Sequence, residues 1–217
     1  TNGNEGDSAP ISVKVDNTIS VPYPVNVTEV TYTLTEMTVK WSQSTDTDFS
    51  KYSLLYSQSE SGTKQTIETY SDKSKISYST TTFDPTQENW YWVEVADTFG
   101  YSIIGNGKTN TIDNPPTVTE IDSITFDGST LYVYWTVNTD ADFKALTVFE
   151  SDNEEMSNSS VLFSSQDQTL YRADSYNHPI STIRYYQIEV EDVWGLKTKS
   201  IVVVGSSYIT FVKTFGA

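Results

Sequence analysis

The sequence has no cysteine and a single histidine, His178, among its 217 residues. Without thiols the chain can build neither a disulfide framework nor a thiolate metal site. A lone imidazole, in the turn Asn177-His178-Pro179, has no second histidine or thiol with which to form a nucleophile–base pair or a histidine zinc site. No phosphate-binding glycine loop and no Gly-x-Ser-x-Gly elbow occurs. We therefore interpret His178 as an ordinary loop residue and predict that the protein is not an enzyme.

Basic residues are also scarce: 13 lysines and arginines face 29 acidic residues, which gives a net charge of −16. A body so acidic repels nucleic acid and anionic membrane surfaces, so we exclude both as partners, whereas divalent cations become plausible ligands. The longest all-aliphatic run, residues 201–204, is far shorter than the ~20 residues of a membrane span. The composition suits an exported protein, and we expect an extracellular or cell-surface location.

What the chain does have is an internal repeat. Residues 37–49 return as residues 131–143, a shift of 131 − 37 = 94, and both copies place a Trp five residues before an Asp-x-Asp-Phe segment. Residues 91–100 return as residues 186–195, a shift of 186 − 91 = 95. This period is too long for a solenoid unit and is typical of a small domain that folds independently. The sequence therefore predicts two tandem domains.

Short segments of alternating apolar residues, rich in Tyr, Thr and Val, predict β-strands throughout the chain. Segments rich in Ser, Asp, Asn and Gly separate them, and residues 57–63 and 151–160 are predicted to be hairpin loops. Pro115-Pro116 cannot continue a central strand, so we place the linker at residues 113–116, between domains at 22–112 and 117–205.

About seven short strands per repeat, with a Trp on the second strand and Tyr-x-Val-x-Val late in the unit, resembles the fibronectin type III domain. The resemblance lies in Leu131-x-Val133-x-Trp135 and the following Asp-x-Asp-Phe, and in the segment from Tyr186 to Gly195, with their first-copy equivalents. It is closest in kind to bacterial and archaeal surface versions. It implies an all-β fold of two tandem seven-stranded, immunoglobulin-like sandwiches in which the repeated Trp and the Tyr-x-Val-x-Val face are core residues. The family leaves function open.

Two segments fall outside the repeat, residues 1–21 and residues 206–217. Both have strand character, as in Ile11-x-Val13-x-Val15 and in residues 208–215. We expect them to form extra N- and C-terminal strands that dock either on their own domain or on a neighbouring subunit, as a donated strand does.

Acidic residues recur at matching places in the two copies. In this topology the loop after the Trp strand and the loop after the Tyr-x-Val-x-Val strand emerge at the pole where the chain enters the domain. We therefore expect Asp140, Asp142 and Asp192 to lie near the linker residues Asp113-Asn114. In the first copy the corresponding residues are Asp46, Asp48 and Asp97, near Asp16-Asn17. Converging carboxylates suit Ca²⁺; alternatively, each Asp accepts backbone N–H bonds within its own turn.

One strand carries two outward tryptophans. Alternation turns Tyr91, Val93 and Val95 inward, so Trp90 and Trp92 share the opposite face with Glu94. Such a pair can stack on sugar rings or on a protein partner, or can be covered by a neighbouring segment. Asn26 and Asn158 begin Asn-x-Ser/Thr triplets, the acceptor pattern for glycosylation.

Two functions remain open at this point. The first is a non-catalytic extracellular structural or adhesive protein, a subunit of a surface appendage, filament or adhesin, whose partners are copies of itself or other surface proteins and which assembles by strand exchange. The second is a carbohydrate-binding accessory module of a lipid-anchored cell-surface protein, with glycans as partners and Trp90, Trp92 and Glu94 as the binding residues.

Overall fold

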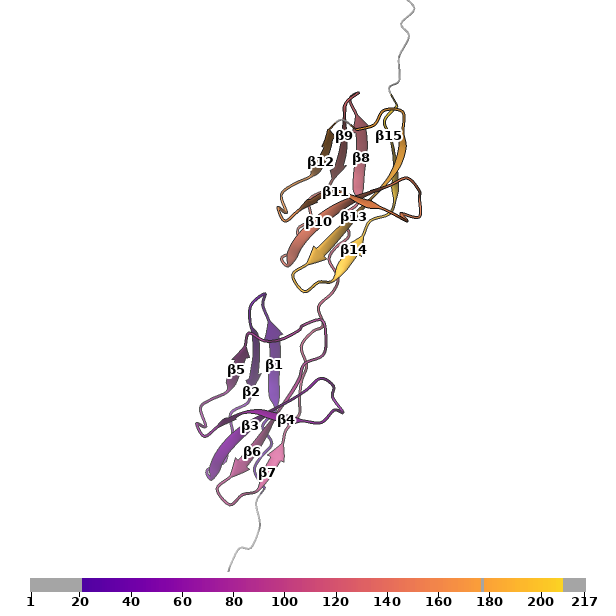
Figure 1. Ribbon diagram of the computed structural model, residues 1–217. Helices are drawn as coiled ribbons and strands as arrows, with labels where there is room; N and C mark the ends of the chain where they lie inside the picture. Colours follow the sequence, from indigo (N-terminus) through magenta and orange to yellow (C-terminus); the bar gives the residue numbers. More distant parts are fainter. Residues whose placement is uncertain (1–20, 177, 209–217) are drawn as a thin grey trace, which may run out of the picture.

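The structure, a computed structural model, describes residues 21–176 and 178–208 and forms two β domains that follow each other along the chain (Figure 1). All of the regular elements in these ranges are strands, and every strand pairing is antiparallel. Within the described ranges the chain offers no helix of the length and apolarity that crossing a membrane requires.

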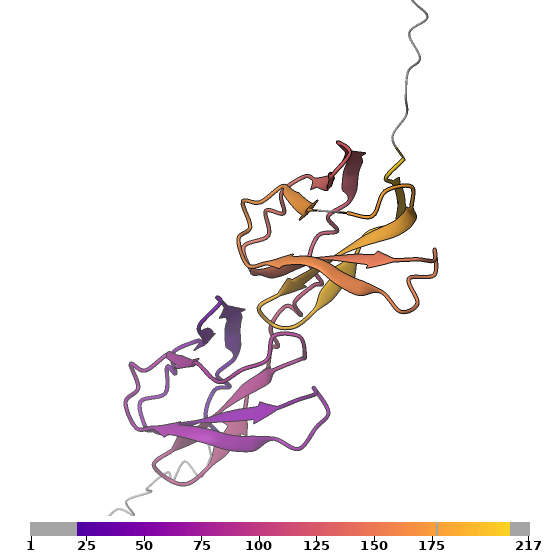
Figure 2. The same cartoon turned by 45° about the horizontal axis from the view of Figure 1, so that its top comes forward.

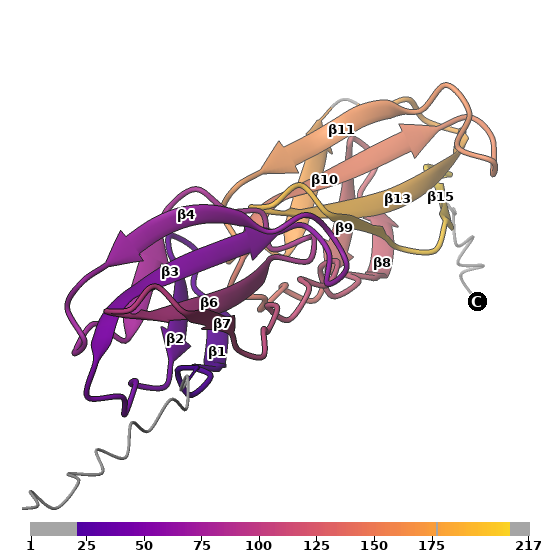
Figure 3. The ribbon, with the colours of Figure 1, turned by 90° about the horizontal axis from the view of Figure 1, so that it is seen from below.

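The first domain packs a three-stranded sheet, in the order β1-β2-β5, against a four-stranded sheet, in the order β4-β3-β6-β7. In Figure 3, β3, β4 and β6 form one layer above β1 and β2. The strands are β1 (Val27–Tyr32), β2 (Met37–Trp41), β3 (Phe49–Ser57), β4 (Gln65–Tyr70), β5 (Ser77–Thr80), β6 (Trp90–Asp97) and β7 (Ser102–Ile104).

The second domain repeats this arrangement, with β12-β9-β8 in one sheet and β11-β10-β13-β14 in the other (Figure 2). Its strands are β8 (Ile121–Phe126), β9 (Thr130–Trp135), β10 (Phe143–Ser151), β11 (Ser160–Ser165), β12 (Arg172–Tyr176), β13 (Ile183–Asp192), β14 (Lys197–Lys199) and β15 (Val203–Ser206). The predicted all-β sandwich fold is confirmed, and both predicted hairpin loops connect consecutive strands, β3 to β4 and β10 to β11.

The second domain has eight strands rather than the predicted seven, because its last strand is divided into β14 and β15, which both pair with β13. The break lies at Ser200, whose hydroxyl accepts the Ile188 amide proton in place of a carbonyl oxygen. Ser206, which the sequence assigned to the C-terminal segment, is the last residue of β15. The rest of the two predicted terminal strands, residues 1–20 and 209–217, lies outside the described residues.

Each domain has its own hydrophobic core, and the two cores are built from repeat-related residues. Met37, Val39 and Trp41 alternate inward on β2, as Leu131, Val133 and Trp135 do on β9. Tyr91, Val93 and Val95 on β6 and Tyr186, Ile188 and Val190 on β13 close the two cores from the opposite sheet. The core roles implied by the resemblance are therefore present in both copies.

Because the cores are separate, we predict that truncating one leaves the other intact. Met37 and Leu131 are both 0% exposed and occupy the same repeat position, so Met37→Ala and Leu131→Ala should each lower the free energy of unfolding by about 2–5 kcal/mol. Differential scanning calorimetry should show one transition shifted by each variant, a different one in the two cases. A single transition shifted equally by both would contradict independent cores.

Candidate metal centre at the domain junction

The centre of the junction is a buried aspartate at the end of β13. Asp192 is 0% exposed, and its Oδ1 accepts the amide protons of Trp194 at 2.8 Å and Leu196 at 2.9 Å. These bonds fix the next turn, in which Gly195 adopts a φ of 90°. The second oxygen, Oδ2, is buried without a hydrogen-bond partner in the described part of the chain.

A second carboxylate comes from the linker. Asp113 is held by the first domain, because its amide donates to the Pro85 carbonyl oxygen at 2.9 Å and its Oδ1 accepts the Tyr32 hydroxyl proton at 2.9 Å. Its Oδ2, like that of Asp192, is buried without a partner among the described residues. One oxygen of the Asp113 carboxylate is thus held by the first domain, and the other has no partner among the described residues.

Asp142, in the loop between β9 and β10, completes the cluster. One carboxylate oxygen from each of Asp113, Asp142 and Asp192 lies within 4.8 Å of the others. Burial first, and then the charges of Asp142 and Asp192, raise the pKa of Asp113 despite the Tyr32 hydrogen bond. A hollow of about 440 Å³, lined from both domains, opens beside Asp113 and Asp142. The expected convergence of these three residues is therefore present.

Asp140 does not join them, contrary to expectation. Its carboxylate accepts the Thr117 amide at 2.6 Å, the Thr117 hydroxyl at 2.8 Å and the Asn138 side-chain amide at 3.1 Å. These bonds lower the pKa of Asp140, although its burial acts in the opposite direction. Asp140 therefore holds its own loop and Thr117, the first residue after the linker. This is close to the alternative role, in which an aspartate accepts backbone N–H bonds.

The first domain repeats part of this arrangement. Asp97 Oδ1 accepts the amides of Phe99 and Tyr101, both at 2.9 Å, and its Oδ2 is buried without a partner in the described ranges. Asp46 accepts the Tyr23 amide at 3.0 Å, as Asp140 accepts that of Thr117, and the Asp48 carbonyl accepts the Thr98 amide. The expected partners Asp16-Asn17 lie outside the described residues.

An aromatic contact crosses the same junction. Trp194, from the turn that Asp192 fixes, lies 6.3 Å from Tyr32 and 5.3 Å from Phe83 between ring centroids, and Tyr32 and Phe83 also contact each other. Burial and the bond to Asp113 raise the pKa of Tyr32 to about 12. Sequence reasoning used Trp194 only as a repeat marker and missed this contact, whose one signal was an aromatic residue at the same turn position in both copies.

The outward tryptophans do not form an open platform, which corrects that prediction. Trp92 is only 6% exposed: Lys64 Nζ lies 4.2 Å from the centre of its ring, and the chain at Gly107 runs so close that an added Cβ would be 2.2 Å from its indole nitrogen. Trp90 stacks on Trp92 at 5.7 Å and donates to Glu88, while Glu94 accepts the Ser102 hydroxyl proton. Neighbouring segments thus cover this face, the alternative left open.

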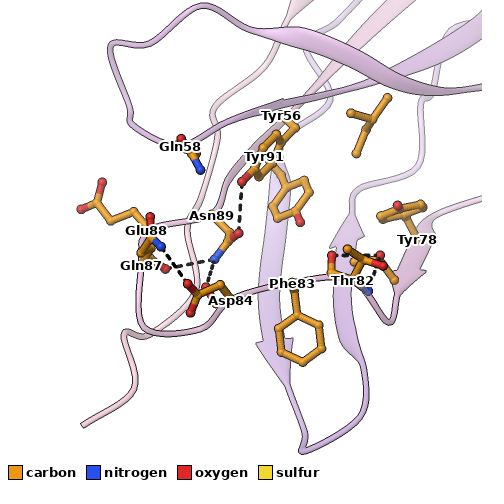
Figure 4. Close-up of a pocket in the computed structure, with 12 residues that line it drawn as sticks. Tyr56, Gln58, Tyr78, Thr82, Phe83, Asp84, Gln87, Glu88, Asn89 and Tyr91 are labelled. Atoms are coloured by element: carbon orange, nitrogen blue, oxygen red, sulfur yellow. Dashed lines mark hydrogen bonds between the residues drawn. The ribbon is translucent and has the colours of Figure 1, made fainter. Parts of the chain in front are cut away.

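A second hollow, also of about 440 Å³, lies beside β5 and β6 in the first domain (Figure 4). Tyr56, Tyr78 and Tyr91 line it together with the loop from Asp84 to Asn89. The polar groups of that loop bond one another: Asn89 donates to the Asp84 and Gln87 carbonyl oxygens, and its own side-chain oxygen accepts the Tyr56 hydroxyl proton. Figure 4 shows these side chains turned toward each other, which is how a loop is braced.

Three other sequence candidates have clear places. His178 follows β12 in a loop, but its side chain is buried and packs against Phe126, 3.5 Å from the Tyr186 hydroxyl. It is therefore a core-facing loop residue. Asn158 is exposed in the β10–β11 loop, whereas Asn26 is half-buried and its side-chain oxygen accepts the Asn106 amide at 2.7 Å. Glycosylation at both remains a prediction.

No protein family model and no curated protein matches the chain. Among solved structures, the FN1–FN3 domains of chicken CNTN1 share 13% identity over 87% of this chain and 69% of that one, with a TM-score of 0.42. The sixth fibronectin type III domain of human fibronectin type III domain containing protein 3 shares 14% identity over 48% and 96% of the two chains, with a TM-score of 0.38.

The Clostridium perfringens spore cortex lytic enzyme SleM shares 17% identity over 42% of this chain and 28% of that one, with a TM-score of 0.35. These values are low, and the fold is decided by the strand order: three strands on four in the first domain, and the same order in the second with its last strand divided. The described residues form two tandem β-sandwich domains whose strand order is like that of a fibronectin type III domain.

Proposed function

We propose that the protein is a non-catalytic, extracellular structural or adhesive module in which two fibronectin type III-like domains are held in series at a fixed orientation. The observation that carries the proposal is the packed junction. A linker of four residues would by itself leave two domains free to move, because small polar interfaces between domains are the usual case. Here Trp194 of the second domain packs on Tyr32 and Phe83 of the first.

The first domain presents the same aromatic position to solvent. Phe99 occupies the place of Trp194 in the repeated Asp-x-aromatic-Gly turn and is 76% exposed. Tyr23 and Tyr101 belong to the same pole, because their backbone amides donate to Asp46 and Asp97. Their side chains are 71% and 41% exposed. We call Tyr23, Phe99 and Tyr101 the N-terminal aromatic patch. Exposed aromatic patches on soluble domains are typical of protein contact sites.

The partner that we propose for this patch is the far pole of the second domain in another copy of the chain. Tyr32 and Phe83, which receive Trp194, correspond by the repeat to Phe126 and His178, at the far pole of the second domain. Docking of Phe99 near that pole would repeat the internal contact between molecules. Such a head-to-tail contact does not close on itself and gives a chain of subunits, the geometry of a surface filament.

The proposal keeps strand exchange by residues 1–21 as a further way of joining copies. The proposed extracellular location rests on the acidic composition and on the domain type. The carbohydrate-binding alternative loses its main support because Trp92 is covered and Glu94 is bonded within the sheet.

We predict that Trp194→Ser weakens the junction and that Phe99→Ser does not affect it. Aromatic pairs contribute about 0.5–1.5 kcal/mol each beyond the area they bury, so losing two should lower the unfolding free energy of the domain that unfolds first in the intact chain by about 1–3 kcal/mol. Phe99→Ser, at the same turn position, should change it by less than about 0.5 kcal/mol, as surface substitutions usually do. Urea unfolding monitored by circular dichroism measures both. Equal effects would mean that Trp194 makes no useful contact.

Self-association tests the head-to-tail contact directly. We expect sedimentation velocity of the intact protein to show a weight-average mass that rises with concentration, because the patch is small and the contact weak. Phe99→Ser should abolish the rise. Val161→Ser, which removes another exposed apolar side chain, from β11, should leave it unchanged. A monomer at every concentration would contradict self-assembly through this patch.

A further inference from the structure

We propose that Asp113, Asp142 and Asp192 bind one Ca²⁺ ion, which ties the linker to the second domain. This inference goes beyond the proposed function. It rests on the three carboxylates and their surroundings, and it does not depend on which partner the tandem domains bind. It assigns a ligand to the hollow at the junction.

The carboxylate of Asp192 has one oxygen without a hydrogen-bond partner. The side chain is fully buried, and its Oδ1 accepts hydrogen bonds from two backbone amides. Its Oδ2 is buried with no hydrogen-bond donor among the described residues, although the same carboxylate belongs to the cluster. A buried polar oxygen left in this way is costly unless it finds a partner or coordinates a metal.

The Oδ2 of Asp113 is in the same condition as that of Asp192. It is buried without a donor in the described part of the chain, while Oδ1 of the same carboxylate is held by Tyr32. Two carboxylates from segments far apart in the sequence, each with one oxygen that lacks a partner in the described ranges, thus meet at one place together with Asp142. Three carboxylates at this spacing repel one another when they are ionised. A divalent cation turns this repulsion into attraction to a common centre.

The spacing of the oxygens fits calcium. Ca²⁺ binds oxygens at ~2.3–2.6 Å, so two ligands on opposite sides of the ion are up to about 5.2 Å apart. The three oxygens lie within 4.8 Å of one another, inside that reach. Ca²⁺ takes six to eight ligands in flexible geometry, which suits carboxylates from three separate segments, whereas Mg²⁺ demands a near-ideal octahedron and keeps its water. The adjoining hollow gives water access for the remaining ligand positions.

The first domain supplies a matched comparison. Asp97 has the same backbone bonds and the same unpaired Oδ2 as Asp192 in the part of the chain that the structure describes, and Asp48 corresponds to Asp142. Among the described residues no third carboxylate joins Asp48 and Asp97 in a cluster, whereas the linker delivers Asp113 to Asp142 and Asp192 at the junction.

Isothermal titration calorimetry of the chelator-treated, intact chain with CaCl₂ tests the site. We expect one Ca²⁺ per chain, and thermal unfolding at a higher temperature in CaCl₂ than in chelator. Asp142→Asn removes a half-buried carboxylate that makes no side-chain hydrogen bond in the described structure, and should weaken binding about tenfold or more, since affinity follows ligand charge. Asp113→Asn should do the same.

Asp48→Asn is the control, because it makes the equivalent change at the first pole and should leave the Ca²⁺ affinity unchanged. Equal weakening by Asp48→Asn and Asp142→Asn would show only diffuse binding to an acidic surface and would overturn the proposal. So would MgCl₂ binding as tightly as CaCl₂, or the absence of both binding heat and a thermal shift with CaCl₂. The far-ultraviolet circular dichroism of each variant establishes that it is folded before it is titrated.

Discussion

The carboxylate of a buried aspartate at the end of a central strand is the constraint on which the junction depends. Asp192 Oδ1 accepts two amide protons from the turn after β13, and Asp97 does the same after β6. Each turn is closed by a glycine with positive φ, Gly195 or Gly100, a conformation that other residues adopt only with strain. The aromatic residue between the aspartate and the glycine, Phe99 or Trp194, therefore points away from its own core and beyond the end of its domain.

The two copies of this turn meet different surroundings, and the difference organises the molecule. Trp194 finds Tyr32 and Phe83 of the preceding domain, while Phe99 is exposed. The same turn also leaves one aspartate oxygen buried and without a partner among the described residues. At the junction the carboxylate of Asp192 lies close to that of the linker residue Asp113, which is itself held to the first domain through Tyr32. A hydrophobic contact and an ionic cluster thus lie side by side, and both join elements of one domain to the other.

Sequence reasoning could predict the features that depend on periodicity and on repetition. The alternation on residues 37–41 and 131–135 defines the core faces, and the topology of a fibronectin type III-like domain brings Asp142 and Asp192 to the linker. It could not predict that Asp140 would be captured by the Thr117 amide and hydroxyl, because side-chain bonding depends on how the linker turns. It also could not show that Lys64 and Gly107 cover Trp92, since alternation defines a face but not the segments that pack on it.

The central claim is that the junction holds the two domains at one orientation, and the absence of cysteine makes this directly measurable. Glu60→Cys in the β3–β4 loop and Glu154→Cys in the β10–β11 loop place one spin label on each domain. Pulsed electron–electron double resonance in CaCl₂ should give a single narrow distance distribution, which broadens when Trp194→Ser is added. A broad distribution in the otherwise unaltered chain with CaCl₂, unchanged by Trp194→Ser, is the result that a freely moving linker would give and would contradict the account.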